Sequence, residues 1–306
     1  MRRIRIGTRG SQLALIQAHL VSDALKAAAP GILTELVVIK TKGDIILDVA
    51  LSKIGDKGLF TKELELSLMR GETDIAVHSL KDIPTRLPDG LHIGAVTERE
   101  DRRDALVSVN NIRLSNLTPL HRIATSSLRR KASLLHHSPG LQVIDIRGNI
   151  NTRIGKMESG YCEAMIMALA GLKRMGMTQF ITEILPPDKF MPAVSQGALG
   201  LETRADDESI TELLERINHR PTWTEISAER AFMRTLEGGC LVPVGCFTVL
   251  DKSDLTISGF VSSTDGSEYL EDKLTGDASD PEKLGITLAK RLLGMGGDKI
   301  LSQIRN

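Results

Sequence analysis

The sequence predicts an α/β protein, because strand-like and helix-like segments alternate along most of it. Residues 3–78 follow a β-α-β-α-β order, and residues 122–168 show the same alternation. Such an order predicts mostly parallel sheets covered by helices. The strands expected at residues 247–250, 255–262 and 269–274 precede one final helix, so the end of the chain predicts a small α+β domain.

Hydrophobic periodicity and turn residues place the individual elements. In the first segment we expect strands at residues 3–7, 34–40 and 75–78 and helices at 11–28 and 59–70. In the second we expect strands at 122–124, 142–146 and 164–168 and helices at 127–137 and 149–159. The charged run at 97–104 and the proline-containing run at 185–196 are expected to cross between domains.

Composition excludes several classes of protein. The 306 residues have a formal net charge of zero and include three cysteines without regular spacing, which argues against a disulfide framework or a metal site. The first residues lack the apolar core of a secretory signal, and no apolar run reaches membrane-spanning length, so we expect a cytoplasmic protein. Aromatic residues are only 3% of the chain, which leaves few rings for stacking on nucleic acid bases.

Three turns share one design, in which a strand ends, polar side chains follow, and a helix begins with an arginine nearby. They lie at residues 7–11, 124–130 and 146–149. Helix N-termini attract anions, and arginine adds bidentate hydrogen bonds to carboxylate or phosphate. Each turn alone also fits an ordinary helix cap. Together they predict a cleft for a ligand with several negative groups.

Asp82 follows the buried strand at residues 75–78, at the carboxyl edge of the sheet. An ionised carboxylate there would suit the stabilisation of a cationic intermediate. A solvated pair with Lys81 in a turn is the alternative. The polar stretch at residues 41–58, followed by Phe60, is expected to form either a mobile lid or an ordinary long connection.

Cys240 follows two glycines and precedes Pro243, so we expect it in a tight turn. It is either an exposed nucleophile or a small buried side chain. Cys162 and Cys246 lie beside apolar strands and are expected to be buried.

A series of motifs, taken in chain order, resembles the porphobilinogen deaminases, also called hydroxymethylbilane synthases. The motifs are IGTRGSQLAL, TKGDIILD, KGLFTKELE, DIAVHSLKDIPT, EREDRRDAL, TSSLRRK, RGNINTR, ALAGLKRMG, QGALG and LEGGCLVPVG. They run from residue 4 to beyond residue 245. Several are long and unusual, and their shared order argues against a chance resemblance.

The resemblance implies three domains, of which the first two resemble type II periplasmic binding protein domains with a cleft between them. Domain 1 would comprise residues 1–97 and 198–216, domain 2 residues 98–197, and domain 3, a small α+β domain, residues 217–306. It also implies a monomeric enzyme that requires no metal and binds neither nucleic acid nor membrane.

The implied enzyme is a transferase of tetrapyrrole biosynthesis. It would join four porphobilinogen molecules head to tail, release four ammonia molecules, and hydrolyse off the linear product, hydroxymethylbilane. The chain would grow on a dipyrromethane cofactor that a thioether joins to Cys240. Asp82 would be the catalytic residue, stabilising the azafulvenium cation formed when ammonia leaves.

The resemblance also assigns binding residues, because substrate and cofactor carry many carboxylates. The residues implied for the cofactor are Lys81, Thr125, Ser126, Ser127, Arg129, Arg130, Arg147, Arg153 and Gln196. Those implied for the substrate are Arg9, Ser11, Gln17, Phe60, Arg147, Arg153 and Arg174. Phe60 would lie over the pyrrole rings, and Arg174 would help the growing chain to move.

The chain departs from the usual family pattern at three positions. Ser195 stands where glycine or alanine is common, Asp56 where glycine is common, and Gln12 where proline is frequent. None is a proposed catalytic group, so these positions bear on backbone stiffness and not on the reaction. The alternative from another class is a non-catalytic solute-binding protein, which would share the arginines but would need neither Cys240 nor Asp82.

Overall fold

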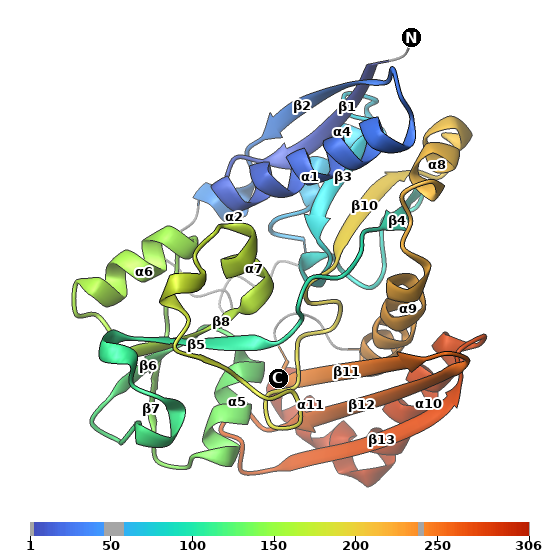
Figure 1. Cartoon of the computed structure of the whole chain (residues 1–306). Helices are drawn as coiled ribbons and strands as arrows, with labels where there is room; N and C mark the ends of the chain where they lie inside the picture. Colours follow the sequence, from blue (N-terminus) through green and yellow to red (C-terminus); the bar gives the residue numbers. More distant parts are fainter. Residues whose placement is uncertain (1–2, 46–57, 238–241, 306) are drawn as a thin grey trace. The chain divides into compact units, whose positions relative to one another are not determined.

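Strands of the described residues form three sheets (Figure 1). The structure is a computed structural model that describes residues 3–45, 58–237 and 242–305. The strand orders are β2-β1-β3-β10-β4, β7-β6-β8-β5-β9 and β11-β12-β13. Helices accompany every sheet, which confirms the predicted α/β class. Within the described part of the chain, no helix is long and apolar enough to cross a membrane.

The first sheet mixes parallel and antiparallel pairs. Its strands are β1 (Arg3–Arg9), β2 (Leu33–Ile39), β3 (Ile75–Ser79), β4 (Leu91–Val96) and β10 (Leu199–Arg204). β1 pairs in parallel with β2 and β3, whereas β10 is antiparallel to both β3 and β4. The prediction of a mostly parallel sheet therefore missed β4 and the direction of β10. A strand that returns from a distant part of the sequence enters a sheet in a direction that local periodicity does not reveal.

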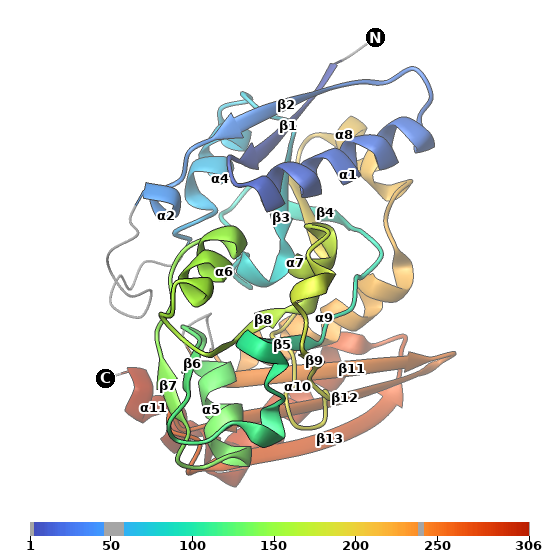
Figure 2. The ribbon, with the colours of Figure 1, turned by 60° about the vertical axis from the view of Figure 1, so that its left-hand side comes forward.

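Helices pack on both faces of this sheet. They are α1 (Gln12–Ala28), α4 (Lys62–Met69) and α8 (Glu208–Glu215), while the short helix α2 (Lys42–Ile45) follows β2 in the chain. Ile75 and Val77 of β3 contribute to the core that includes α1 and α8, and α1 can be followed along β1 and β3 in Figure 2. Ala76 between them belongs to the separate core beneath Leu64 of α4. Alternation along the strand thus divides the apolar residues between the two faces.

The second sheet repeats the arrangement of the first without a visible sequence repeat. Its strands are β5 (Asp104–Ser108), β6 (Arg122–Ala124), β7 (Gln142–Ile144), β8 (Ala164–Ala168) and β9 (Glu183–Ile184). β6 is parallel to β7 and β8, and β5 is antiparallel to β8 and β9. The helices are α5 (Leu128–His137), α6 (Ile150–Glu158) and α7 (Leu169–Arg174), with 3-10 turns at Val109–Asn111, Leu114–Asn116 and Thr178–Phe180. Core residues of α6 and α7 cluster together, and Leu134 of α5 belongs to another cluster.

The third sheet is antiparallel, and helices that precede and follow its strands in the sequence share its hydrophobic core. Its strands are β11 (Val244–Asp251), β12 (Asp254–Ser262) and β13 (Tyr269–Asp277). The accompanying helices are α9 (Arg220–Thr235), α10 (Pro281–Leu292) and α11 (Asp298–Arg305), with a π turn at Leu293–Gly297. Phe232 of α9, Ile257 of β12 and Leu288 of α10 share one core. This confirms the predicted α+β character of the end of the chain.

The chain divides into two units. Among the described residues it passes between them after residue 100, in the first predicted crossing segment, after residue 196, at the end of the second, and also after residue 223, inside α9. Of the described residues, unit 1 comprises 3–45, 58–100 and 197–223, and unit 2 comprises 101–196, 224–237 and 242–305. The first and second sheets thus lie in different units, and the third sheet belongs to unit 2. The division into three domains with the boundaries given above remains a prediction.

Two residues close to the junction between the units, at positions 195 and 197, have left-handed backbone conformations. Ser195 has φ 62°, and its N–H donates to the buried carboxylate of Glu229 over 2.7 Å. Gly197 has φ 95°, and a Cβ atom there would lie 2.3 Å from the carbonyl oxygen of Glu100. A left-handed conformation favours glycine, so Ser195 occupies a backbone position that most side chains avoid. At position 197, backbone strain and close packing both require glycine.

Gly197→Ala is expected to lower the free energy of unfolding by more than about 2 kcal/mol, because strain and a backbone clash add together. Gly71→Ala is the matched control, since Gly71 also has positive φ but a Cβ atom there would have no neighbour within 4 Å among the described residues. It should cost only about 1 kcal/mol. Urea unfolding of both variants measures the difference. Equal losses would show that the contact with Glu100 contributes nothing.

Candidate functional site

In unit 2, two neighbouring arginines are buried around one carboxylate. Arg129 and Arg130 lie in the first turn of α5, and their side chains are only 5% and 8% exposed. Arg129 Nη1 lies 2.8 Å from one oxygen of Asp104, and Arg130 Nη2 lies 2.7 Å from the other. The Gln196 amide donates to Asp104 over 2.8 Å and to the Arg102 carbonyl over 2.7 Å. Four side chains from three segments are therefore joined in one buried cluster.

The cluster carries two positive charges and one negative charge. Burial raises the pKa of the Asp104 carboxyl, but the charges and hydrogen bonds of Arg129 and Arg130 outweigh burial and hold that pKa well below its usual range. The Nε atoms of both arginines are buried and have no hydrogen-bond acceptor in the described part of the chain. A buried group with excess positive charge and unused donors favours an additional anion. The arrangement therefore fits a ligand carboxylate.

The hydroxyl groups predicted in this site mainly bind the local backbone. Ser127 Oγ caps α5 by accepting from Arg130 N over 3.4 Å. Ser126 Oγ donates to the Ile146 carbonyl over 2.7 Å, and Thr125 Oγ1 accepts from Ser127 N over 3.3 Å. The strand–turn–helix geometry predicted here is confirmed. A role of these hydroxyls toward a ligand remains a prediction.

Further arginines surround the N-terminus of α6 and the end of α7. Asn149 caps α6 by accepting from Thr152 N over 2.9 Å. Arg153 Nε donates to the Gly148 carbonyl over 2.8 Å, and the backbone carbonyl of Arg147 accepts from Lys156. Arg174 is the last residue of α7. The Arg147, Arg153 and Arg174 residues are each half-buried. Unit 2 thus has arginines near the N-terminus of α6 and at the C-terminal end of α7.

In unit 1, Asp82 is exposed at the end of a 3-10 turn, η1 (Leu80–Asp82), which follows β3 directly. Leu80 and Ile83 on either side are buried, and Leu80 N donates to the Ala198 carbonyl over 3.0 Å. The carboxylate of Asp82 makes no hydrogen bond to another described residue, whereas Lys81 does have partners. The predicted position beyond the strand is therefore confirmed, and the turn is held firmly while its acid remains accessible.

The other predicted residues of unit 1 lie near the end of β1 or on α1. Ser11 caps α1 by accepting from Ala14 N over 3.3 Å. Gln17 is only 3% exposed, and its amide donates to Ser79 Oγ over 2.9 Å. The guanidinium of Arg9 stacks on the Phe60 ring, with its carbon 4.1 Å from the ring centroid. Gln17 therefore connects α1 to the strand that precedes Asp82.

The structure describes two of the three cysteines. Cys162 and Cys246 are buried, as predicted, and burial raises the pKa of the Cys162 thiol to about 11. Cys240 lies in residues 238–241, outside the described residues. The flanking residues Leu236 and Val242 are both buried in the core of the third sheet. The polar stretch at residues 41–58, expected to form either a mobile lid or an ordinary long connection, likewise falls mostly on residues 46–57, outside the described residues.

Sequence reasoning missed the carboxylates that neutralise the arginines internally. Asp104 ends the charged run, and Asp44 lies in the TKGD motif, but neither was predicted as part of a site. His78 is buried, and its Nε2 atom lies 3.0 Å from a carboxylate oxygen of Glu202. Among the described residues, no group of His, Cys, Asp and Glu could hold a metal ion.

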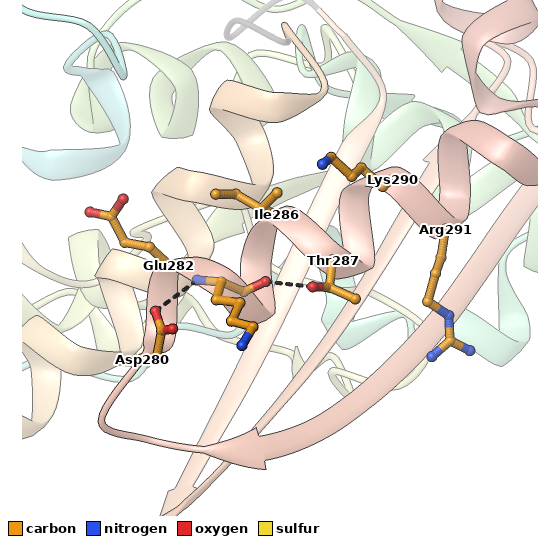
Figure 3. A pocket seen from close by; sticks show the side chains of 7 residues that line it. Asp280, Glu282, Ile286, Thr287, Lys290 and Arg291 are labelled. Atoms are coloured by element: carbon orange, nitrogen blue, oxygen red, sulfur yellow. Dashed lines mark hydrogen bonds between the residues drawn. The ribbon is translucent and has the colours of Figure 1, made fainter.

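A shallow hollow lies on α10 of unit 2. Its lining includes Lys283, Thr287 and Arg291 (Figure 3). Thr287 Oγ1 donates to the Lys283 carbonyl, and Arg291 pairs with Asp272 over 2.7 Å. These contacts support the helix and the adjacent strand, and the hollow contains none of the predicted site residues.

Two family models, each for one domain of the same family, match most of the chain. One, described as "Porphobilinogen deaminase, dipyromethane cofactor binding domain", matches residues 4–212, and the "C-terminal domain" of porphobilinogen deaminase matches residues 223–294. The chain belongs to the porphobilinogen deaminase family. This confirms the resemblance inferred from the motifs.

Curated relatives are similar in sequence to this chain over nearly its whole length. Porphobilinogen deaminase of Synechococcus elongatus is 52% identical over 99% of this chain and 96% of its own length. The enzyme of Geobacter sulfurreducens is 49% identical over 99% of this chain and 95% of its own length, and that of Moorella thermoacetica is 49% identical over 100% and 97%.

Similar solved structures include the periplasmic VFT2 domain of BvgS from Bordetella pertussis. It has 14% identity and a TM-score of 0.43, over 74% of this chain and 92% of that one. A putative methionine-binding lipoprotein from Bacillus subtilis has 10% identity and a TM-score of 0.44, over 72% and 92%.

Asp104→Asn should lower the free energy of unfolding at neutral pH by about 3–5 kcal/mol, because it leaves two buried guanidiniums without a carboxylate. The folded pKa of Asp104 is depressed, so its contribution is complete above the unfolded pKa of about 4 and is lost as the pH falls toward the folded value. The difference in free energy of unfolding between wild type and Asp104→Asn should therefore stay constant between about pH 8 and pH 6 and shrink below about pH 4.

Chemical unfolding across this pH range measures the effect. Glu163→Gln is the matched control, since it neutralises a partly exposed carboxylate that pairs with Arg122 in the same unit. Exposed pairs contribute only about 0–1 kcal/mol. A loss for Asp104→Asn no larger than that of the control would contradict a structural role of the buried cluster.

Proposed function

We propose that this chain is a hydroxymethylbilane synthase, which joins four porphobilinogen molecules head to tail and releases four ammonia molecules and the linear tetrapyrrole. Family membership over nearly the full chain carries the proposal. The cationic residues described above support it, because each substrate pyrrole bears one acetate and one propionate. The proposal includes a monomer in the cytoplasm that acts on porphobilinogen and does not bind nucleic acid.

The residues of unit 2 fit a polycarboxylate cofactor. Arg129 and Arg130 have excess positive charge and unused buried donors, which suits the carboxylates of a dipyrromethane. Thr125, Ser126, Ser127, Arg147, Arg153 and Gln196 would complete its binding. Cys240 would hold it through a thioether. When bound, the cofactor supplies the pyrrole carbon to which the first substrate is added.

Asp82 would act on the substrate in each cycle. When the carbon–nitrogen bond to ammonia breaks, positive charge develops on the substrate pyrrole. An ionised carboxylate nearby stabilises that charge without itself forming a bond. The exposed position of Asp82 on a firmly held turn supports this role, because the group is accessible and needs no large rearrangement.

The remaining arginines would bind the substrate and the growing chain. Arg9, Arg147, Arg153 and Arg174 provide guanidiniums for acetate and propionate groups. Phe60 would pack on a pyrrole ring. Ser11 caps α1 and Gln17 of α1 binds Ser79, so both would stabilise the part of unit 1 that binds the substrate. Each added pyrrole brings two carboxylates. Several separate cationic groups can therefore bind the growing chain at successive additions, which a single cationic group could not do.

The intact mass of the purified protein should exceed that of the bare sequence by one thioether-linked dipyrromethane. Cys240→Ser should have the bare mass and no turnover, because serine does not form the thioether. Cys162→Ser is the control and should keep the added mass, since Cys162 is buried elsewhere in unit 2. A bare mass in protein that is active on porphobilinogen would exclude the covalent cofactor.

Asp82→Ala should keep the added mass and lower kcat at least about 100-fold, because it removes a preorganised charge that stabilises the transition state. Asp89→Ala is the matched control, since Asp89 is an exposed acid a few residues further along the same unit. It should turn over porphobilinogen at the wild-type rate. Comparable rates for Asp82→Ala and wild type would remove the catalytic role assigned to Asp82.

A further inference from the structure

Three side chains meet at the end of β1 in unit 1. Arg9 Nε donates to Asp44 Oδ1 over 3.2 Å, and Arg9 Nη2 donates to the same oxygen. The face of the Arg9 guanidinium stacks on the Phe60 ring at 4.1 Å. One edge and one face of this guanidinium are therefore occupied by the protein itself.

Asp44 is held in place from its other side. Thr41 Oγ1 donates to Asp44 Oδ2 over 2.7 Å, and Thr41 N donates to it over 3.3 Å. Thr41 is fully buried. Burial raises the pKa of the Asp44 carboxyl, but hydrogen bonds from Arg9 and Thr41 outweigh burial and leave that pKa below its usual value. Asp44 is thus an ionised, oriented carboxylate.

Phe60 is also fixed, because its ring packs against the backbone of Gly43. A Cβ atom at position 43 would lie 2.1 Å from Phe60 Cε1, so only glycine permits this contact. Gly43 N donates to the Leu59 carbonyl over 3.0 Å, which joins α2 to the turn that carries Phe60. The TKGD motif therefore supplies both the carboxylate and the glycine surface that hold Arg9 and Phe60.

The opposite edge of Arg9 remains available. Its Nη1 group makes no hydrogen bond to a described residue, and the side chain is 24% exposed. A guanidinium has five N–H donors and can bind a carboxylate at each of two edges. A second carboxylate can therefore bind Arg9 without displacing Asp44.

We propose that Asp44 is a positioning residue for substrate binding, which holds Arg9 by one edge so that the other edge receives a carboxylate of the pyrrole substrate. The inference rests on the proposed function. Since Arg9 and Asp44 together carry no net charge, binding at this point depends on the geometry of the donors more than on long-range attraction. Such a site suits a ligand that binds and leaves repeatedly.

The test compares steady-state kinetics of Asp44→Asn and wild-type holoenzyme. We expect KM for porphobilinogen to rise at least about fivefold with kcat changed less than about twofold, because Asp44 acts on binding and not on the chemical step. Glu35→Gln is the matched control, since Glu35 pairs with Arg3 on the same two strands, β1 and β2, over 3.3 Å. Its KM should equal that of wild type.

Two further variants keep the test decisive if Asp44→Asn folds poorly. Thr41→Val removes the 2.7 Å hydrogen bond to Asp44 while retaining its charge, and should also raise KM. Arg9→Lys combined with Asp44→Asn should be no worse than Arg9→Lys alone, because a positioning residue has no effect once its target is replaced. Additive losses would overturn the inference.

Calorimetric binding of a pyrrole that bears acetate and propionate but no aminomethyl group gives a readout independent of turnover. Its Kd should rise for Asp44→Asn as KM does. An unchanged or lower Kd, with normal thermal unfolding, would overturn the positioning role, since it would mean that Asp44 competes with the substrate or does not affect it. Absence of turnover in wild-type holoenzyme would instead reject the proposed function.

Discussion

The burial of two adjacent guanidiniums around the single carboxylate of Asp104 is the constraint on which much of unit 2 depends. Asp104 begins β5, Arg129 and Arg130 lie in the first turn of α5, and Gln196 ends the proline-containing run at residues 185–196. One charge centre therefore fixes a strand, a helix and a connection together. Removing charged groups from water is costly unless they are paired and hydrogen-bonded, so the cluster tolerates few rearrangements. Its remaining positive charge is then available for an anion.

Unit 1 also contains an arginine that is held in place by an internal carboxylate. Arg9 is held by Asp44 along one edge and by Phe60 along one face, just as Arg129 and Arg130 are held by Asp104. In both places an internal acid orients a guanidinium before any ligand arrives. Preorganised donors lose little conformational entropy on binding, which favours recognition of successive carboxylates. A family whose substrate and product are both polycarboxylates benefits from donors fixed in this way.

Local backbone contacts explain why hydroxyl groups are common in these turns. Ser11, Ser127 and Asn149 each cap a helix, and Ser126 joins the backbone of Ile146. These bonds orient the helix N-termini and the arginines that follow. The ordinary capping role and the binding role are therefore compatible, because a cap that fixes the first helical turn also fixes the side chains on it.

The sequence by itself determined the family, the α/β class, the strand–turn–helix order at the three turns, and the position of Asp82 beyond a buried strand. These features are local or depend on motifs in chain order. Only the tertiary structure decided that β10 enters the first sheet antiparallel to β3, that Asp44 and Asp104 are the internal partners of the arginines, and that Gln17 is buried against Ser79. These contacts join residues at least 25 positions apart, with the Arg129 to Asp104 contact the shortest in sequence. Hydrophobic periodicity reports which face of an element is buried, but it does not report which distant charge or strand will lie against it.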